Sequence, residues 1–163
     1  MSYLRFTAAL LLLLALNTGV SRADATDDAR RELFSWFAGV ETPRREAEKL
    51  TIKDVEGLDT KAHTGDLEPA EVLACYKTLK DRFTKGLADA VAFKAETAEI
   101  RDLNDLLTHY MKRKLDALVR CVADLEKDDK KAFAHDQLVF LMTDADNFLK
   151  MKDALVKRYA GTR

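Results

Sequence analysis

Apolar residues recur along much of this chain at spacings of three and four, which place side chains on one face of an α-helix. The clearest run is Val72, Tyr76, Leu79, Phe83, Leu87 and Ala90. A second run has the same spacing at Ile100, Leu103, Leu107, Tyr110, Leu118, Val122 and Leu125. A third, predicted as one last helix, carries Phe133, Leu138, Leu141, Ala145, Phe148, Leu155 and Tyr159. No stretch alternates apolar and polar residues as a strand would, so the pattern predicts an all-α protein.

An earlier helix is predicted from about Thr26 to Val40, with Thr26 or Asp27 as its N-terminal cap. Its aromatic residues cannot all face the core, because Phe34 and Trp36 lie about 200° apart on a helix. Trp36 is expected in the core. The alternative is an exposed aromatic anchor, since tryptophan is enriched at binding hot spots, and this makes Trp36 a candidate contact for a partner protein.

The dipeptide Thr42-Pro43 predicts the end of that helix, because proline lacks an amide hydrogen and clashes with the preceding turn. A short helix is expected over Arg44–Leu50. The stretch Thr51–Asp66 is the least periodic and is expected to form a long ordered loop. Its His63 lies among carboxylates and is a second candidate for a partner contact, with an ordinary polar loop residue as the alternative.

The second and third helical runs form either a hairpin or one continuous helix, because only one glycine, Gly86, and no proline lies between Pro69 and Lys131. In a hairpin that turns near residue 98, Cys75 and Cys121 come level and are predicted to form a disulfide in an oxidising compartment. In one continuous helix the two cysteines lie about 69 Å apart. Two buried free thiols are the alternative to the bridge.

Together these runs predict an antiparallel four-helix bundle, with an extra short helix or long ordered loop after the first helix. The chain is 47% hydrophobic and 34% charged with 6 Gly and 2 Pro, which excludes collagen-like, low-complexity and wholly disordered proteins. Residues 24–163 are long enough for a single helical domain with its own core. Apolar residues left over on the helices also leave a homodimer seam open.

The N-terminus has the pattern of a signal peptide. Arg5 precedes an apolar run over 6–16, and small residues follow at Ser21 and Ala23, as a signal peptidase site requires. The run is too short to cross a bilayer, which needs roughly 20 apolar residues. We expect cleavage of 1–23, with cleavage after Ala25 as the close alternative. The mature chain is then expected to have no transmembrane segment and to be soluble in the periplasm or outside the cell.

Charge and motifs exclude several classes of function. The formal net charge of -1 and the mixing of basic with acidic residues argue against nucleic-acid binding. No metal-binding His-Glu-x-x-His or Cys-x-x-Cys motif and no Gly-x-Ser-x-Gly motif occurs, and Ser35 is the only serine after residue 23. We therefore expect no metal ligands, no cofactor and no catalytic residues.

One weak candidate pair for a cofactor remains. If the last hairpin turns near Asp129, His109 comes level with Met151, and a His/Met pair across a bundle holds the iron of some haem proteins. The alternative is a solvated polar face at His109 and a gap-filling core methionine at Met151.

The sequence thus predicts a non-enzymatic, exported helical module that binds another extracytoplasmic protein or an envelope component. An inhibitor, an immunity protein or a chaperone fits this description. The alternative is a carrier of a small ligand, haem or metal in the bundle core.

Overall fold

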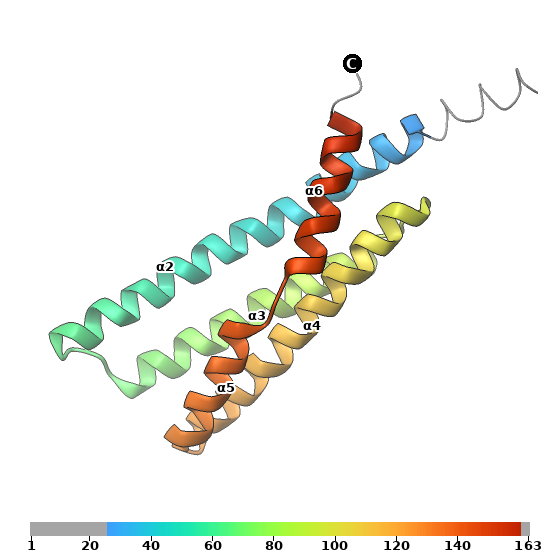
Figure 1. Ribbon diagram of the computed structural model, residues 1–163. Helices are drawn as coiled ribbons and strands as arrows, with labels where there is room; N and C mark the ends of the chain where they lie inside the picture. The colour runs from blue at the N-terminus through green and yellow to red at the C-terminus, as the bar shows by residue number, and fades with distance from the viewer. Residues whose placement is uncertain (1–25, 161–163) are drawn as a thin grey trace, which may run out of the picture.

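The computed structural model describes residues 26–160 and is helical over nearly all of them. The predicted signal peptide, 1–23, and both of its cleavage sites lie outside these residues. A helix over 26–36 is followed by η1 (Phe37–Glu41), α2 (Thr42–Thr64), α3 (Pro69–Ala92), α4 (Ala98–Glu126), α5 (Lys130–Met142) and α6 (Asp146–Ala160) (Figure 1). No strand occurs in this part of the chain, which confirms the all-α prediction. None of its helices is long and apolar enough to cross a membrane.

The first helix does not end at Thr42-Pro43, so that prediction is wrong. The chain stays helical from residue 26 to Thr64 by widening into a π-turn directly before the proline. There the amide of Thr42 bonds to the carbonyl of Phe37, five residues back. Proline in a regular helix clashes with the carbonyl four residues earlier and leaves it unbonded. A π-turn shifts the hydrogen-bond ladder at that point, and the helix continues.

The loop predicted over Thr51–Asp66 is helical as far as Thr64, and the short helix expected over Arg44–Leu50 is part of α2. One interior glycine, Gly57, costs about 1 kcal/mol relative to alanine, which is too little to break a helix held by tertiary contacts. Arg82 of α3 donates to Asp54 over 2.6 Å and supplies one such contact. The helix ends where Gly65 adopts a left-handed φ of 80°.

The second and third runs form a hairpin, which decides between the two alternatives left open by the sequence. Helices α3 and α4 are separated by residues 93–97 and pack along each other. Their facing stripes supply fully buried side chains to the core, among them Leu79, Ile100, Leu103, Leu107 and Leu118. In Figure 1, α2, α3, α4 and α5 run side by side in alternating directions, while α6 leaves that direction and crosses the first helix.

The last predicted helix is in fact two, α5 and α6, which are separated at residues 143–145. Buried Lys114 of α4 donates to the carbonyl of Phe140, and the hydroxyl of Thr143 donates to Val139. These bonds satisfy carbonyls that the end of a helix leaves without partners. The carboxylate of Asp144 then accepts the amide of Asp146 over 2.6 Å and starts α6.

Helix α6 is fixed to the bundle by a buried charged cluster at the π-turn. Glu41 is fully buried and accepts hydrogen bonds from Arg44 Nε over 2.7 Å and from Lys152 Nζ over 2.8 Å. Both cations lie over the ring of Phe148, at 5.5 and 5.3 Å from its centroid. Burial acts to raise the pKa of Glu41, but the hydrogen bonds and charges of its two cations outweigh it and leave the pKa lowered. We call Glu41, Arg44, Lys152 and Phe148 the α6 anchor.

Candidate functional site

An apolar groove of about 290 Å³ separates α2 from α5, with α3 as its floor. Helix α2 packs along α3, and α5 packs along α4, so the two outer helices do not close over the floor. The walls and floor of this α2–α5 groove are formed by Val55, Leu58, Asp59, Ala62, Leu67, Val72, Tyr76, Phe133 and Gln137. The groove therefore depends on residues 51–64 being a helix.

The floor of the groove meets the α5 wall at a packed aromatic pair. The ring of Tyr76 packs edge-on against Phe133 with centroids 5.1 Å apart, and its hydroxyl accepts a 2.8 Å hydrogen bond from Gln137 Nε2. Burial raises the pKa of Tyr76 to about 12, so the hydroxyl stays protonated at neutral pH. The hydrogen bond between Tyr76 and Gln137 occupies polar groups of both side chains. A bound partner would therefore contact mainly apolar surface in the groove.

Exposed aliphatic side chains continue this surface along both rims. On α2, Val55 lines the groove and is 39% exposed, and Ile52, one turn earlier on the same face, is 57% exposed. On α5, Leu141 lies one turn after Gln137 and is 63% exposed. Apolar surface gathered in one concave place marks an interaction site more strongly than scattered exposed residues do.

Asp59 supplies the negative charge at the groove. Its side chain is 74% exposed, and the nearby ring nitrogen Nδ1 of His63 lies 3.7 Å from a carboxylate oxygen. The same nitrogen lies 2.8 Å from the backbone carbonyl of Asp59, one helical turn earlier. His63, predicted as a loop contact residue, thus lies exposed on α2 next to the rim rather than inside the groove.

Trp36 is not a surface residue, so its candidacy as a partner contact is wrong and the core interpretation is confirmed. Its side chain is fully buried, and its indole nitrogen donates to Asn104 Oδ1 over 2.9 Å. The amide nitrogen of Asn104 in turn donates to the carbonyl of Ala90 over 2.8 Å. The exposed aromatic residue of this helix is Phe34, at 60%.

His109 and Met151 do not form a common site in the structure. His109 is exposed on α4, whereas Met151 is half-buried on α6 and packs against the core. Within residues 26–160 no three His, Cys, Asp or Glu side chains gather as a metal site would require. The hollow against the core beside Phe83 and Met111 is only about 10 Å³, about the space of one water molecule.

Cys75 and Cys121 are free thiols, so the predicted bridge is not formed in this structure. The two residues are level in the hairpin, but they differ in orientation about their helices. Cys75 is half-buried and faces α2 near Asp54. Cys121 is fully buried and interacts electrostatically with Asp136 on α5. Burial raises the pKa of Cys75 and raises that of Cys121 to about 11, which makes both thiols poor nucleophiles.

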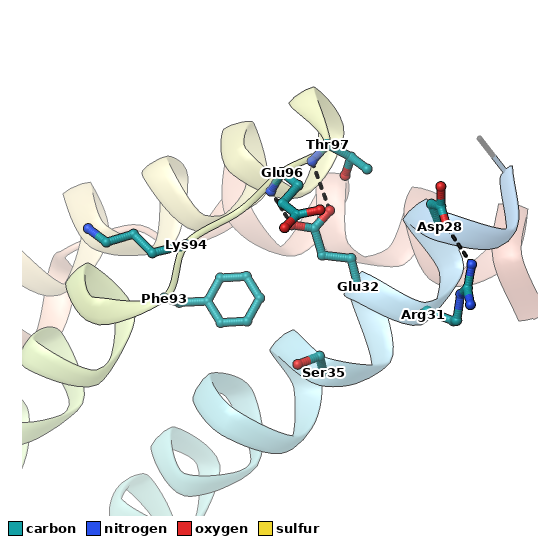
Figure 2. Close-up of a pocket in the computed structure, with 8 residues that line it drawn as sticks. All are labelled: Asp28, Arg31, Glu32, Ser35, Phe93, Lys94, Glu96 and Thr97. Carbon is teal, nitrogen blue, oxygen red and sulfur yellow. Dashed lines mark hydrogen bonds and ion pairs between the residues drawn. The ribbon is translucent and has the colours of Figure 1, made fainter. Parts of the chain in front are cut away.

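A second hollow, of about 430 Å³, lies where the first helix meets the 93–97 turn (Figure 2). Figure 2 shows Glu32 extending to this turn, where its carboxylate accepts the backbone amides of Glu96 and Thr97. Arg31, at the edge of the hollow, pairs with Asp28. Since Thr97 makes no side-chain cap of its own, Glu32 caps the start of α4 and has a structural role.

Replacing Glu32 by Gln is expected to lower the free energy of unfolding by about 1 kcal/mol, because a charged cap at a helix N-terminus becomes neutral. Urea denaturation followed by circular dichroism measures the change. Asp28→Asn is the matched control, since Asp28 is exposed and pairs with exposed Arg31, and it is expected to change stability by less than about 0.5 kcal/mol. Equal effects of the two substitutions would contradict the capping role.

No protein-family model matches this sequence, and comparison with curated proteins and with solved structures finds no similar protein.

Proposed function

We propose that this protein is an exported, non-enzymatic helical module that binds another extracytoplasmic protein through the α2–α5 groove. The single observation that carries the proposal is the groove itself, an apolar channel between two helices with exposed aliphatic rims. Export rests on the signal-like sequence of residues 1–23. An inhibitor, an immunity protein or a chaperone of the cell envelope fits this function.

The occupant that fits the groove is an amphipathic helix. A channel flanked by two helices and floored by a third is the place where a bundle receives one more helix. A visiting helix that lays its apolar face into such a channel buries side chains at spacings of three, four and seven residues. Asp59 at the rim favours a basic residue at the corresponding position of the partner.

The chemistry of the lining supports binding rather than catalysis. Among the polar residues of the groove, Tyr76 and Gln137 are bonded to each other, and Asp59 is largely exposed. General acid–base catalysis needs a positioned group with a pKa near the working pH. The raised pKa of Tyr76, about 12, lies far from that range.

Val55→Glu is expected to leave the fold intact, since this side chain is already 39% exposed, and to weaken partner binding at least about tenfold. The reason is that the bound partner would cover a carboxylate with apolar side chains. The test compares co-purification of the partner from an envelope extract of the exporting cell, and then calorimetric titration with that partner. Circular dichroism checks folding.

Val91→Glu is the matched control, because Val91 is 54% exposed on α3 and does not line the groove. It is expected to bind like the wild type. Wild-type binding by the Val55→Glu variant would overturn the groove as the docking surface. A small molecule that leaves on denaturation in native mass spectrometry, with no protein partner, would instead support the ligand-carrier alternative.

A further inference from the structure

Helix α6 is attached to the bundle through a small part of its surface. It packs on α4 and crosses the first helix (Figure 1). Within 146–159 the buried residues are Phe148, Leu155 and Tyr159. Helix α4, in contrast, buries side chains at every turn over most of its length. Segments with few buried apolar contacts are the ones that open locally while the rest of a domain stays folded.

Charged groups make up much of this attachment. Near the middle of α6, Lys152 donates to buried Glu41 over 2.8 Å. Near its end, the hydroxyl of Tyr159 donates to Glu99 over 2.5 Å, and Arg158 pairs with the same carboxylate. A buried ion pair adds little net stability, because water solvates both charges again when they separate. The few buried apolar side chains therefore supply most of the free energy that holds α6 closed.

The break at 143–145 has the properties of a hinge between α5 and α6. Thr143 has an extended backbone there, with φ -64° and ψ 114°. The hydrogen bonds that end α5 come from Lys114 of α4 and from Thr143 itself, so they do not depend on α6. Residues at the ends of helices are the usual hinges, because they absorb changes in φ and ψ. A change of dihedral angles at 143–145 therefore reorients α6 and leaves α5 in place.

We propose that α6 opens from the bundle as one unit about 143–145 while the other helices stay folded, and that the pair of Glu41 with Lys152 sets the fraction of open molecules. The π-turn supports this role, since it places Glu41 under α6, and π-turns inside helices are frequent at functional sites. Helix α6 does not line the α2–α5 groove, so this proposal goes beyond the proposed function and is tested separately from it.

Opening of α6 has a defined structural consequence. The ring of Phe148 lies 6.2 Å from that of Trp36 and stacks on that of Tyr110 at 6.5 Å, measured between centroids. The hydrogen bond from Trp36 to Asn104 joins the first helix to α4 and does not involve α6. When α6 opens, Trp36 and Tyr110 are therefore uncovered on one side while the helices that carry them stay folded.

Hydrogen exchange of the purified protein, followed by mass spectrometry at neutral pH, tests the opening. In the wild type, amides along all of α6 are expected to exchange at one common rate, at least about tenfold faster than those in the middle of α3 and α4. Equal rates in α6 and α4 would overturn the proposal. Fast exchange confined to the C-terminal end of α6 would show fraying and would also overturn it.

The role of Glu41 is tested by the same measurement. Glu41→Gln is expected to speed exchange in α6 at least about a hundredfold, with α3 and α4 still slower, because Lys152 stays buried without its carboxylate only in the closed state. Glu48→Gln is the matched control, since it removes the other carboxylate of Arg44 and does not contact α6, and an increase of about fivefold or less is expected. Equal effects of the two substitutions would contradict control by Glu41.

A thiol placed under α6 gives a second test that keeps Glu41 intact. Leu155 is 4% exposed on α6, and native Cys121, fully buried on α4, is the matched control within the same molecule. In the Leu155→Cys variant, the thiol at position 155 is expected to react with N-ethylmaleimide at least about tenfold faster than Cys121, as measured by peptide mass spectrometry. Comparable rates would show that both thiols are exposed only by global unfolding, and would overturn the proposal.

Discussion

Replacing Glu41 by Gln is expected to lower the free energy of unfolding by about 3–5 kcal/mol, the range observed when one partner of a buried ion pair is removed. The substitution leaves the side chains of Arg44 and Lys152, which are 8% and 14% exposed, without the carboxylate that both contact. Since a domain of this size is stable by only about 5–15 kcal/mol, the loss is a large fraction of the total. Urea denaturation measures it.

Two controls separate the charge of Glu41 from its volume. Glu48→Gln removes the other carboxylate of Arg44, but its side chain is 34% exposed, so a loss of about 1 kcal/mol or less is expected. Replacing Glu41 by Leu together with Arg44→Met and Lys152→Met removes the charges as a set. This triple variant is expected to be more stable than Glu41→Gln, because no buried charge is left unpaired. The opposite order would contradict the anchor as an ion-pair device.

The anchor also sets a pH dependence. Because the pKa of Glu41 is lowered in the folded chain, its stabilisation is complete above the unfolded value of 4.5 and is lost as pH falls through the folded pKa. Unfolding free energies measured from neutral pH into this acid range should therefore fall more steeply for the wild type than for Glu41→Gln. Parallel curves for the two chains would show that Glu41 does not carry this acid sensitivity.

Trp36→Ala is expected to cost about 3–5 kcal/mol, the usual loss when a fully buried large aromatic side chain is truncated. The substitution also leaves the side-chain oxygen of Asn104 without its donor, at 7% exposure. Trp36 is the only tryptophan, so circular dichroism rather than fluorescence must follow the urea denaturation.

Trp36→Phe separates packing from hydrogen bonding, because it keeps an aromatic ring and removes the donor. It is expected to lose less than Trp36→Ala, by about 1–3 kcal/mol. If Trp36→Ala instead folds with wild-type stability and loses only partner binding, the buried position of this side chain would be contradicted.

The helical stripes of α3 and α4 could be predicted from the sequence, but the turn between them could not, because no proline and only Gly86 lies between Pro69 and Lys131. The apolar residues of the two helices keep a strict helical spacing over many turns, and Thr97 stands at the start of α4. Two such stripes bury each other whichever other helices surround them. Trp36 was expected in the core, but the sequence left an exposed position open, because Phe34 and Trp36 lie about 200° apart and only the structure shows that Phe34 is the exposed one.

The length of α2 was not predicted, because Pro43 and Gly57 both disfavour the interior of a helix. The π-turn that accommodates Pro43 and the hydrogen bond from Arg82 to Asp54 are seen only in the folded structure. Ile52, Val55 and Asp59, at spacings of three and four, carried a helical signal within the predicted loop. Without α2 as a wall, the groove could not be found.

The break between α5 and α6 is also set by residues distant in sequence. No glycine or proline occurs between Met142 and Asp146, so no strong helix breaker marks this break in the sequence. Buried Lys114 on α4 donates a hydrogen bond to a terminal carbonyl of α5, and Lys152 of α6 donates a hydrogen bond to Glu41. The sequence spacing aligned Cys75 with Cys121 along the hairpin but did not fix their rotation about the two helices.

The most direct test of the central claim, that the α2–α5 groove receives a partner helix, is photo-crosslinking in the exporting cell. A photoreactive residue is placed at Ile52 on one rim, at Leu141 on the other, and at exposed Val91 on α3 as a control. The account predicts one discrete product, with the same partner protein at both rims and none at Val91. No product at either rim, or the same products at all three positions, would contradict it.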